Sequence, residues 1–482
     1  MNIVWLKRDL RLSDHLPLLK ASSDPFIFIY IFEPSVSFNY DFDIRHWRFV
    51  FQSIKDMEST GAKVHCLYGE ALDVFRELSS RFKDITVYSH TETGNDLTYS
   101  RDIEVGQFFK TKNFRWHEFS PYGVIRGLKH RDGWDQNWIQ YVKSSLVKSG
   151  DLTQMKYFDD LNESFKIPND LLPLLESIEA KMVTGGENFA KKMLDDFIGK
   201  KVESYWGSLS YPEKSNYFSS KLSAYLAWGN ISIKQIYQTC LDANESVSNK
   251  KSLNQFMARL KWHCHFIQKL ESEPRIEFEN LNTAFNGIRQ KKDKKKIKAW
   301  KEGRTGYPLI DAAMRCVAET GYLNFRLRAT VVSFLTHSLW QPWQAGAGFL
   351  ARQFLDYEPG IHFSQFQMQA GTTGINTLRI YNPVKQSKEK DKEGEFIKRW
   401  IPELRDLPIK FIHEPWLLTE MDELMYNFKL GRSYPKRIVD IDVAHKEARD
   451  ILWSTKDSKS SKRNSKSILK KHAKKRNHGN HR

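Results

Sequence analysis

The heptapeptide Phe26-Ile27-Phe28-Ile29-Tyr30-Ile31-Phe32 decides how the first part of the chain is interpreted. It consists of β-branched and aromatic residues, a composition typical of a strand, and it is the longest of five such runs. Helix-length segments such as 44–60 and 71–82 separate these runs, and this alternation predicts a doubly wound parallel α/β sheet. The other four runs span residues 2–6, 63–67, 85–89 and 114–116.

The turn after the first run excludes one common class of α/β domain. A nicotinamide-binding Rossmann domain carries G-x-G-x-x-G at this place, where its glycines let the backbone approach the pyrophosphate. This chain has Lys7-Arg8-Asp9-Leu10-Arg11 there instead. The α/β domain therefore serves another purpose.

Helical periodicity replaces the strand signal in the second half of the chain. Ile310, Ala313, Met314 and Val317 follow the spacing of one helix face, and Gly321 marks its end. We therefore predict that the second domain is all-α. The predicted organisation is an α/β domain at 1–125, a connector at 126–187, a helical domain at 188–455 and a basic tail at 456–482.

Length and composition support a folded chain with more than one domain. The chain has 482 residues, which is longer than a single hydrophobic core usually supports. Hydrophobic residues make up 40% of it and aromatic residues 13%, as in a folded protein. Charges precede any apolar stretch at the start, and no apolar run reaches the length of a membrane span, so we expect a cytoplasmic protein without a membrane partner. The four cysteines are too scattered for a compact metal motif and are predicted to be core thiols.

The formal charge of +17 is concentrated near the end of the chain. Eleven basic residues and one acidic residue lie between Lys456 and Arg482. We expect this tail to be disordered and to hold nucleic acid through phosphate contacts, or else to serve only solubility. A second basic run, at 291–298, is suited to phosphate contacts or is a solvated loop.

Two polar features in the helical half suggest a ligand. Ser219-Ser220-Lys221-Leu222-Ser223 precedes an apolar helical run, so hydroxyls, backbone N–H groups and a lysine can converge on a phosphate; N-capping serines are the alternative. Arg328 and Asp356 are charged residues within apolar segments, and such residues usually pair.

Several motifs then carry a resemblance to a known family. They are W-K-E-G-R-T-G-Y-P-L-I-D-A-A-M-R at 300–315, F-R-L-R at 325–328, R-I-Y-N-P at 379–383, E-G-E-F-I-K-R-W-I-P-E-L at 393–404 and V-W-L-K-R-D-L-R at 4–11. Together they resemble the photolyase/cryptochrome family over nearly the whole chain, up to about Trp453. The chain is identified as an atypical, bacterial-type member.

The resemblance implies an N-terminal antenna domain and a helical domain that holds a U-shaped, noncovalent FAD. It implies a possible antenna chromophore of the folate or deazaflavin type, although no motif identifies it. The residues that match the family's FAD contacts are Tyr205, Ser219, Ser220, Lys221, Leu222, Ser223, Arg328, Asp356, Tyr357, Glu358 and His362.

The segment Asp356 to Met368 is expected to be a loop that faces the flavin ring. Arg328 supplies the fixed cation that an anionic reduced flavin needs, and Asp356 holds it in place. His362 falls beside flavin N5, where it can donate or accept a proton near neutral pH, or it forms only structural hydrogen bonds.

Electron supply departs from the family pattern. Trp300 and Trp343 match the outer and middle positions of the family's tryptophan chain, but Phe366 stands at the position next to the flavin. Trp340, Trp262 or Tyr357 are possible substitutes, and packing alone is the alternative role for each tryptophan.

The predicted substrate side departs further. Trp262 is retained, whereas Arg259 replaces a glutamate, Met368 replaces a second stacking tryptophan, and Phe325-Arg326 stands where the family has Asn-Arg. The histidine pair of 6-4 photolyases is absent. We assign Trp262, Trp300, Trp343 and His362 as catalytic candidates, and Arg259, Trp262, Phe325, Arg326 and Met368 as DNA contacts.

The leading hypothesis is a blue-light-driven DNA photolyase that splits pyrimidine dimers by electron transfer from excited reduced FAD. A cryptochrome-like photoreceptor without repair activity is the alternative. A third hypothesis is an FAD-containing nucleic-acid binder with neither activity. The oligomeric state is not indicated by the sequence.

Overall fold

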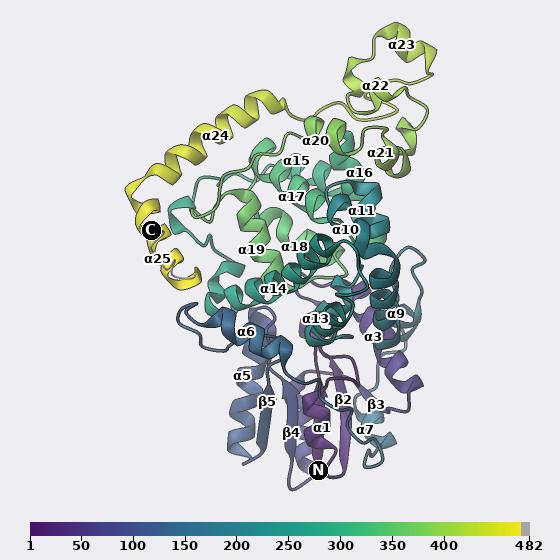
Figure 1. Ribbon diagram of the computed structural model, residues 1–482, viewed down its shortest axis with the longest axis vertical. Coiled ribbons are helices and arrows are strands. Elements are labelled where there is room, and N and C mark those ends of the chain that lie inside the picture. Colours follow the sequence, from purple (N-terminus) through teal and green to yellow (C-terminus); the bar gives the residue numbers. More distant parts are fainter. Residues whose placement is uncertain (474–482) are drawn as a thin grey trace.

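The computed structural model describes residues 1–473, and its amino-terminal part is built on a parallel sheet (Figure 1). The order of the strands is β3-β2-β1-β4-β5, and every neighbouring pair is parallel. The predicted α/β class is therefore confirmed. The strands are β1 (Asn2–Leu6), β2 (Phe26–Phe32), β3 (Val64–Tyr68), β4 (Thr86–His90) and β5 (Arg115–Phe119).

The two faces of the sheet belong to different hydrophobic cores because side chains alternate along each strand. Ile3 and Ile29 pack with Phe75 of α4 and Val105 of α5 on one face. Val4 and the neighbouring strand residues of the other face join a larger core that extends into the helical domain. The helices of this part are α1 (Leu16–Ala21), α2 (Pro34–Ser37), α3 (Ile44–Ser59), α4 (Ala71–Arg81) and α5 (Asp96–Thr111).

The helical domain packs on the point where the strand order reverses, beside β1. Ligands usually bind there in open α/β sheets, but here Leu10 N donates to Trp228 O at 3.2 Å, and the Arg11 guanidinium donates to Gly229 O at 2.8 Å. Gly229 has a φ of +70°, and a Cβ at this residue would lie 2.1 Å from Arg8 O. Only glycine therefore permits this approach.

The segment that was predicted to be a polar connector contains a helix that contributes to the core. Trp134 and Trp138 of α6 are buried, and α6 packs on α13. The predicted boundaries at 125, 187 and 455 stay predictions. The connector helices are α6 (Trp134–Lys143), α7 (Asp159–Ser164) and α8 (Leu172–Glu176).

The rest of the described chain is helical, as predicted (Figure 1). The helix expected after Tyr307 is α16, which has Pro308 in its first turn and ends at Gly321, where φ is +68°. The helices are α9 (Glu187–Asp196), η1 (Phe197–Lys201), α10 (Val202–Ser208), α11 (Pro212–Phe218), α12 (Ser223–Ala227), α13 (Ile233–Asp242), α14 (Lys250–Ser272), η2 (Pro274–Glu277), η3 (Thr283–Phe285), α15 (Lys294–Lys301), α16 (Pro308–Thr320), α17 (Phe325–Ser333), η4 (Phe334–Ser338), α18 (Gln344–Gln353), α19 (Pro359–Ala370), α20 (Pro383–Lys390), α21 (Glu395–Trp400), η5 (Pro402–Leu404), α22 (Ile409–Ile412), η6 (Pro415–Leu417), α23 (Glu420–Met425), α24 (Ile441–Asp457) and α25 (Lys459–His472).

The expectation that Asp356 to Met368 is a loop is wrong after its first three residues. Glu358 is the N-cap of α19, and Pro359 stands in the first turn of that helix. Proline and glycine together indicated a turn, but proline is also favoured at the first helical position because its missing N–H is not needed there. Helix α19 packs closely on α14, since a Cβ at Gly360 would lie 2.6 Å from the Cα of Ile267.

The expectation that the chain is disordered from residue 456 onward is also wrong for the described residues. Helix α24 continues to Asp457, and α25 spans Lys459–His472. Burial of Ile468 against Leu270 and Leu281 stabilises α25 despite its many charges. The part of the predicted tail at 474–482 lies outside the described residues.

The cysteines lie in the hydrophobic cores or pack against them, and the helices bear on whether the chain can cross a membrane. The cysteines are free, and Cys240, Cys264 and Cys316 are buried, as expected of core thiols. Among residues 1–473, no helix combines the length and the apolar character that crossing a membrane requires.

Candidate functional site

One large cavity brings the predicted FAD and DNA residues together in the helical domain. Its volume is about 600 Å³, within the usual range for a cofactor site. Trp300 and Trp343 are the two predicted residues that do not line it. The lining includes Tyr205, Ser219, Ser220, Lys221, Leu222, Ser223, Arg259, Trp262, Phe325, Arg326, Arg328, Asp356, Tyr357, Glu358, His362 and Met368. We call this space the main cavity.

The predicted ion pair forms at the inner end of the main cavity. Nη2 of Arg328 donates to both carboxylate oxygens of Asp356, at 2.9 and 2.8 Å. The guanidinium also lies 3.9 Å from the centre of the Phe354 ring, and its Nε donates to Leu323 O at 2.8 Å. Arg328 is thus fixed on three sides, as a cation that must keep its position requires.

The α/β domain holds the segment that contains Asp356. Arg8 donates to Tyr357 O at 3.1 Å and lies 3.3 Å from a carboxylate oxygen of Glu358. The Tyr357 hydroxyl donates to Asp41 at 2.6 Å. Burial raises the pKa of Glu358 to about 7, although Arg8 opposes this effect. Both domains therefore determine the shape of the inner end.

His362 lies in α19 at the same end, and its tautomer can be inferred. Its Nε2 is 2.9 Å from Ala347 O; because a carbonyl can only accept, Nε2 carries the proton and Nδ1 is left as an acceptor. Burial lowers the pKa of His362 to about 4. The imidazole is therefore neutral near pH 7, contrary to the expectation that it exchanges a proton there.

The Ser219–Ser223 loop forms another part of the wall. Helix α12 begins after this loop without a side-chain cap, and Ser219 Oγ is buried without a partner. A local cap therefore does not explain Ser219, whereas Ser220 Oγ accepts from Leu222 N at 3.3 Å, at the start of the helix. Lys221 has a φ of +55° and points its ammonium over the Tyr322 ring at 3.6 Å. Burial lowers the pKa of Lys221 to about 8, so the lysine is still mostly charged at pH 7, and a bound anion would stabilise that charge.

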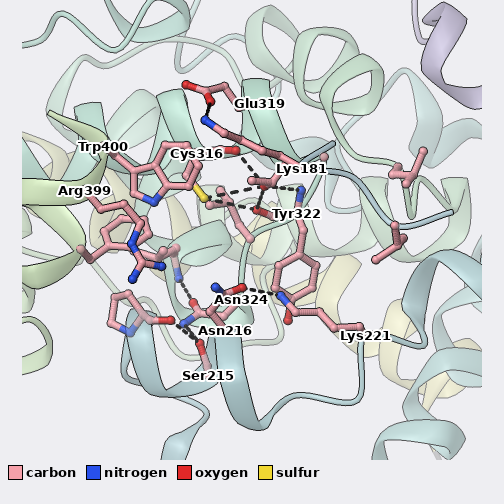
Figure 2. Close-up of a pocket in the computed structure, with 18 of the residues that line it drawn as sticks. Lys181, Ser215, Asn216, Lys221, Cys316, Glu319, Tyr322, Asn324, Arg399 and Trp400 are labelled. Atoms are coloured by element: carbon pink, nitrogen blue, oxygen red, sulfur yellow. Dashed lines mark hydrogen bonds and ion pairs between the residues drawn. The ribbon is translucent and has the colours of Figure 1, made fainter. Parts of the chain in front are cut away.

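A second cavity of about 570 Å³ lies beside this loop (Figure 2). We call it the side cavity. Lys221 and Asp356 line both cavities, and Lys221 donates to Asn216 Oδ1 at 2.7 Å. Figure 2 shows the ion pair between Lys181 and Glu319 at the edge of the side cavity. Lys221 therefore stands between two spaces, and a ligand in either one can approach it.

Unpaired polar atoms in the main cavity fit a polar cofactor. Buried polar groups nearly always have hydrogen-bond partners, so orphaned ones call for an explanation. Five such atoms belong to residues that line this cavity, and a ligand with hydroxyl, phosphate and amide groups can pair with them. They are Ser219 Oγ, His263 Nδ1, Arg326 Nε, Glu358 Oε1 and Gln365 Oε1.

The predicted DNA residues surround the mouth of the main cavity. Trp262 is 50% exposed and Phe325 is 45% exposed. The Arg259 guanidinium lies 5.8 Å from the Phe325 ring centre, and that of Arg326 lies 5.3 Å from the Tyr381 ring centre. This mouth offers aromatic faces and cations to a base, but it offers no carboxylate at the position of Arg259.

The predicted electron route is not continuous in the expected form. Trp300 is fully buried, so its assignment as the outer residue of a chain that reaches the surface is wrong. It packs on Phe349, and its indole N–H donates to Val331 O at 3.0 Å. Trp343 lies 6.5 Å from Phe366 between ring centres, and Phe366 lies 4.7 Å from His362. A phenyl ring thus separates Trp343 from the main cavity.

Sequence reasoning missed two groups of residues. Tyr322 and Phe354 position Lys221 and Arg328, and no motif marks them. Asp9, His15 and His90 form a buried cluster in which one Asp9 oxygen lies 3.0 and 2.7 Å from the two histidines. Burial raises the pKa of Asp9, but these hydrogen bonds outweigh it and hold the pKa well below its usual range. Finding this cluster required knowing that β1 lies beside β4.

Comparison with known proteins agrees with the fold and the site. The family described as DNA photolyase matches residues 2–124, and the FAD binding domain of DNA photolyase matches residues 256–454. A deoxyribodipyrimidine photo-lyase of Alkalihalophilus pseudofirmus is 25% identical over 93% of this chain and 97% of its own length. A cryptochrome DASH of Gloeobacter violaceus is 26% identical over 91% of this chain and 93% of its own.

A solved structure extends this similarity to three dimensions. The bacterial class III photolyase from Agrobacterium tumefaciens has a TM-score of 0.81 and 25% identity, and the match covers 95% of this chain and 98% of the other. The helical domain is accordingly an FAD-binding domain. The chain belongs to the photolyase/cryptochrome family.

Proposed function

We propose that the protein is a blue-light-driven DNA photolyase that splits UV-induced pyrimidine dimers. The observation that carries this proposal is the continuity of one cavity, from the partly buried Arg328–Asp356 pair to the half-exposed Trp262 at its mouth. Such a cavity can hold a cofactor at its inner end and still admit a flipped base from outside.

FAD fits the inner part of the main cavity. In this proposal, the Ser219–Ser223 loop and Lys221 hold the diphosphate, and Tyr205 packs beside them. Arg328 and Asp356 lie beside the isoalloxazine ring, where the fixed guanidinium stabilises negative charge. Nδ1 of His362 would accept a hydrogen bond from a protonated flavin N5. Glu358 Oε1, which has no partner in the protein, would accept a hydrogen bond from another group of the cofactor.

The mouth provides contacts for a lesion. Trp262 stacks on a flipped base, Met368 and Phe325 supply apolar walls, and Arg259 and Arg326 attract the phosphates or the base oxygens. Bound reduced FAD would supply the electron chemistry that splits the dimer under blue light, with no net redox change over the reaction. A second, light-harvesting chromophore is part of this proposal, but its chemical class stays open.

A repair assay tests the proposal directly. The purified, reduced holoprotein is illuminated with DNA that carries either a cyclobutane dimer or a 6-4 photoproduct, and lesion loss is followed by chromatography. We expect the cyclobutane dimer to be lost in light and retained in darkness. Retention of both lesions under illumination would show that the protein does not repair them.

The mouth favours a photoreceptor as the second candidate, because Arg259 and Met368 leave it without a carboxylate or a second stacking ring for a lesion; the electron supply of such a receptor can be tested. Phe366 separates Trp343 from the main cavity, and a phenyl ring is hard to oxidise, so the bound flavin is isolated from the usual electron supply. If the protein is a receptor, blue light still changes the flavin spectrum persistently in the absence of DNA. Phe366→Trp should accelerate that change, and Phe396→Trp, in the same buried core, serves as the control. A spectrum that light does not change would exclude the receptor function.

A further inference from the structure

Helix α25 carries a row of cations whose positions are set by the fold. Lys459, Arg463, Lys466 and Lys470 recur at spacings of four, three and four residues. At about 100° per residue they lie within about 60° of one another on the helix surface. All four are exposed. We call this row the α25 basic ridge.

The opposite side of α25 is anchored to the helical domain. Ser461, Ile468 and His472 are buried. Asn282 Nδ2 donates to Ser461 O at 3.1 Å and to Ser465 Oγ at 3.2 Å, and Asn464 Nδ2 donates to Thr283 Oγ1 at 3.0 Å. Gly374 keeps this contact close, since a Cβ there would lie 2.7 Å from Ser465 Oγ. The ridge therefore points to solvent.

The ridge is not neutralised by nearby acids. Helix α25 contains no Asp or Glu. The two acidic residues that contact this helix are already paired with other cations: Asp457 with Lys462, and Glu273 with Lys471. Within residues 1–473, none of the four ridge residues makes a salt bridge. The cations are thus available to an outside anion.

The helix that carries the ridge is linked to the mouth of the main cavity. Helix α14 connects the two: Trp262 lines the mouth, and Glu273 caps the end of that helix, where Lys471 and His472 contact it. Eleven residues separate Trp262 from Glu273, which is about 16 Å of helix. His265 continues the link, with its ring 5.4 Å from that of Trp262. Figure 1 shows α24 and α25, in yellow, along the side of the helical domain.

We propose that the α25 basic ridge binds the phosphate backbone of the DNA arm that flanks a lesion held at the mouth. The inference rests on DNA as the partner in the proposed function and adds a second point of contact to it. Helix α25 lies beyond residue 454, where the match to the family model ends, so membership of the family does not by itself imply this contact. The ridge spans about 16 Å, or about five base pairs at 3.4 Å each.

The geometry determines what the contact can do. A row of lysine and arginine side chains reads no base sequence, so it strengthens the binding of damaged and undamaged duplexes alike. Its helix is anchored at Glu273, about 16 Å along α14 from Trp262, so the ridge reaches only DNA that extends about five base pairs or more beyond the lesion. Each phosphate contact also makes the affinity more sensitive to salt.

The test replaces the four ridge residues together with glutamine in the full-length holoprotein. Binding to a duplex of about 30 base pairs is measured in darkness by fluorescence anisotropy, at several salt concentrations. We expect the affinity to fall about tenfold or more at low salt, and the plot of log K against log salt to become shallower by about 0.9 for each lost contact. A pentanucleotide with the same lesion should bind with unchanged affinity, because it cannot reach α25.

Two further variants separate a positioned ridge from general charge. Lys20, Lys83, Lys110 and Lys112 are exposed lysines of the α/β domain, and replacing all four with glutamine removes equal charge without changing the salt dependence. Ile468→Ser keeps every ridge cation but removes the apolar anchor, so it should lose most of the affinity that the ridge provides. Flavin absorbance should be the same in all variants, and circular dichroism should be the same in all except Ile468→Ser, which should lose only the helical signal of α25.

Four results would overturn the inference: an unchanged salt slope in the ridge variant, an equal change in the control variant, an equal loss with the pentanucleotide, or binding of the ridge to anionic lipid vesicles and not to DNA. Because every readout is binding in darkness, these results are independent of lesion repair. A protein that repairs DNA with an unchanged slope would refute the ridge alone, and one that shows the slope change without repair would refute the proposed function alone.

Discussion

The inner end and the mouth of the main cavity are constructed in opposite ways. Glu358 at the inner end is buried, the Asp356 carboxylate is almost covered, and bonds from both domains hold this segment. Trp262 and Phe325 at the mouth are about half exposed and have neighbours on one side only. The inner end is therefore rigid before any ligand arrives, whereas the mouth can adapt. This difference suits the proposed function, in which the inner end fixes one cofactor and the mouth adapts to a lesion.

The largest effect is expected from breaking the inner ion pair. Asp356→Asn leaves the Arg328 guanidinium without its counter-charge, and we expect the purified protein to lose most of its flavin. Unfolding should become easier by about 2 kcal/mol, less than for a fully buried pair because Arg328 is 27% exposed. Flavin absorbance and a denaturant titration measure the two effects.

The control for this change is an exposed ion pair. Glu58→Gln breaks the pair with Lys55, and we expect a loss of less than about 1 kcal/mol and normal flavin content. If Asp356→Asn retains full flavin, the inner end does not depend on this pair, and the contrast with the mouth disappears.

A change at the mouth should have the opposite profile. Trp262→Ala removes a stacking surface, which is worth about 1–3 kcal/mol for each base, so the affinity for lesion DNA should fall about tenfold or more. Flavin content should stay normal. The control is Phe38→Ala, which removes an aromatic ring that is 85% exposed in the α/β domain and should change neither property. Loss of flavin in the Trp262 variant would show that mouth and inner end are not separable.

The pH dependence of flavin binding tests the Ser219–Ser223 loop, which lines the main cavity together with the inner end and the mouth. Burial lowers the pKa of Lys221 to about 8 without ligand, and a bound diphosphate would raise it. Binding above pH 8 then requires proton uptake, so the affinity should fall by up to about tenfold as the pH rises from 8 to 9. Fluorescence titration of the apoprotein measures it. Lys221→Met should remove this dependence, whereas Lys112→Met should keep it.

The smallest expected effect concerns His362. Because burial lowers its pKa to about 4, its charge does not change between pH 6 and 8. Flavin retention should therefore be flat over this range, in the wild type and in His362→Asn alike. A step near pH 6.5 that is absent from the variant would mean that the imidazole is protonated in the cavity.

The sequence predicted the elements and most of the cavity, because these depend on local patterns and on motifs. Strand and helix positions follow from periodicity, and Arg328 and Asp356 follow from charges in apolar segments. The packing around them was not predictable: Phe354 beneath Arg328, or the carbonyl that determines the tautomer of His362, depends on contacts between distant segments. The prediction that the tail is disordered was wrong for a related reason. Ile468 stands among many lysines and gives no helical periodicity, so its burial could not be predicted before its contacts with Leu270 and Leu281 were known.

The close approach at Gly229 restricts how this molecule can be altered by recombination. A helical half taken from a relative would need a glycine at the position of Gly229, and a foreign α/β half would need a guanidinium at the position of Arg11, since the contacts of Arg8 and Leu10 at this approach use backbone atoms. Chimeras joined within the connector should therefore fail to assemble unless residues 7–11 and 228–230 come from the same parent. In any chimera, residues 7–11 and 228–230 therefore have to be exchanged together.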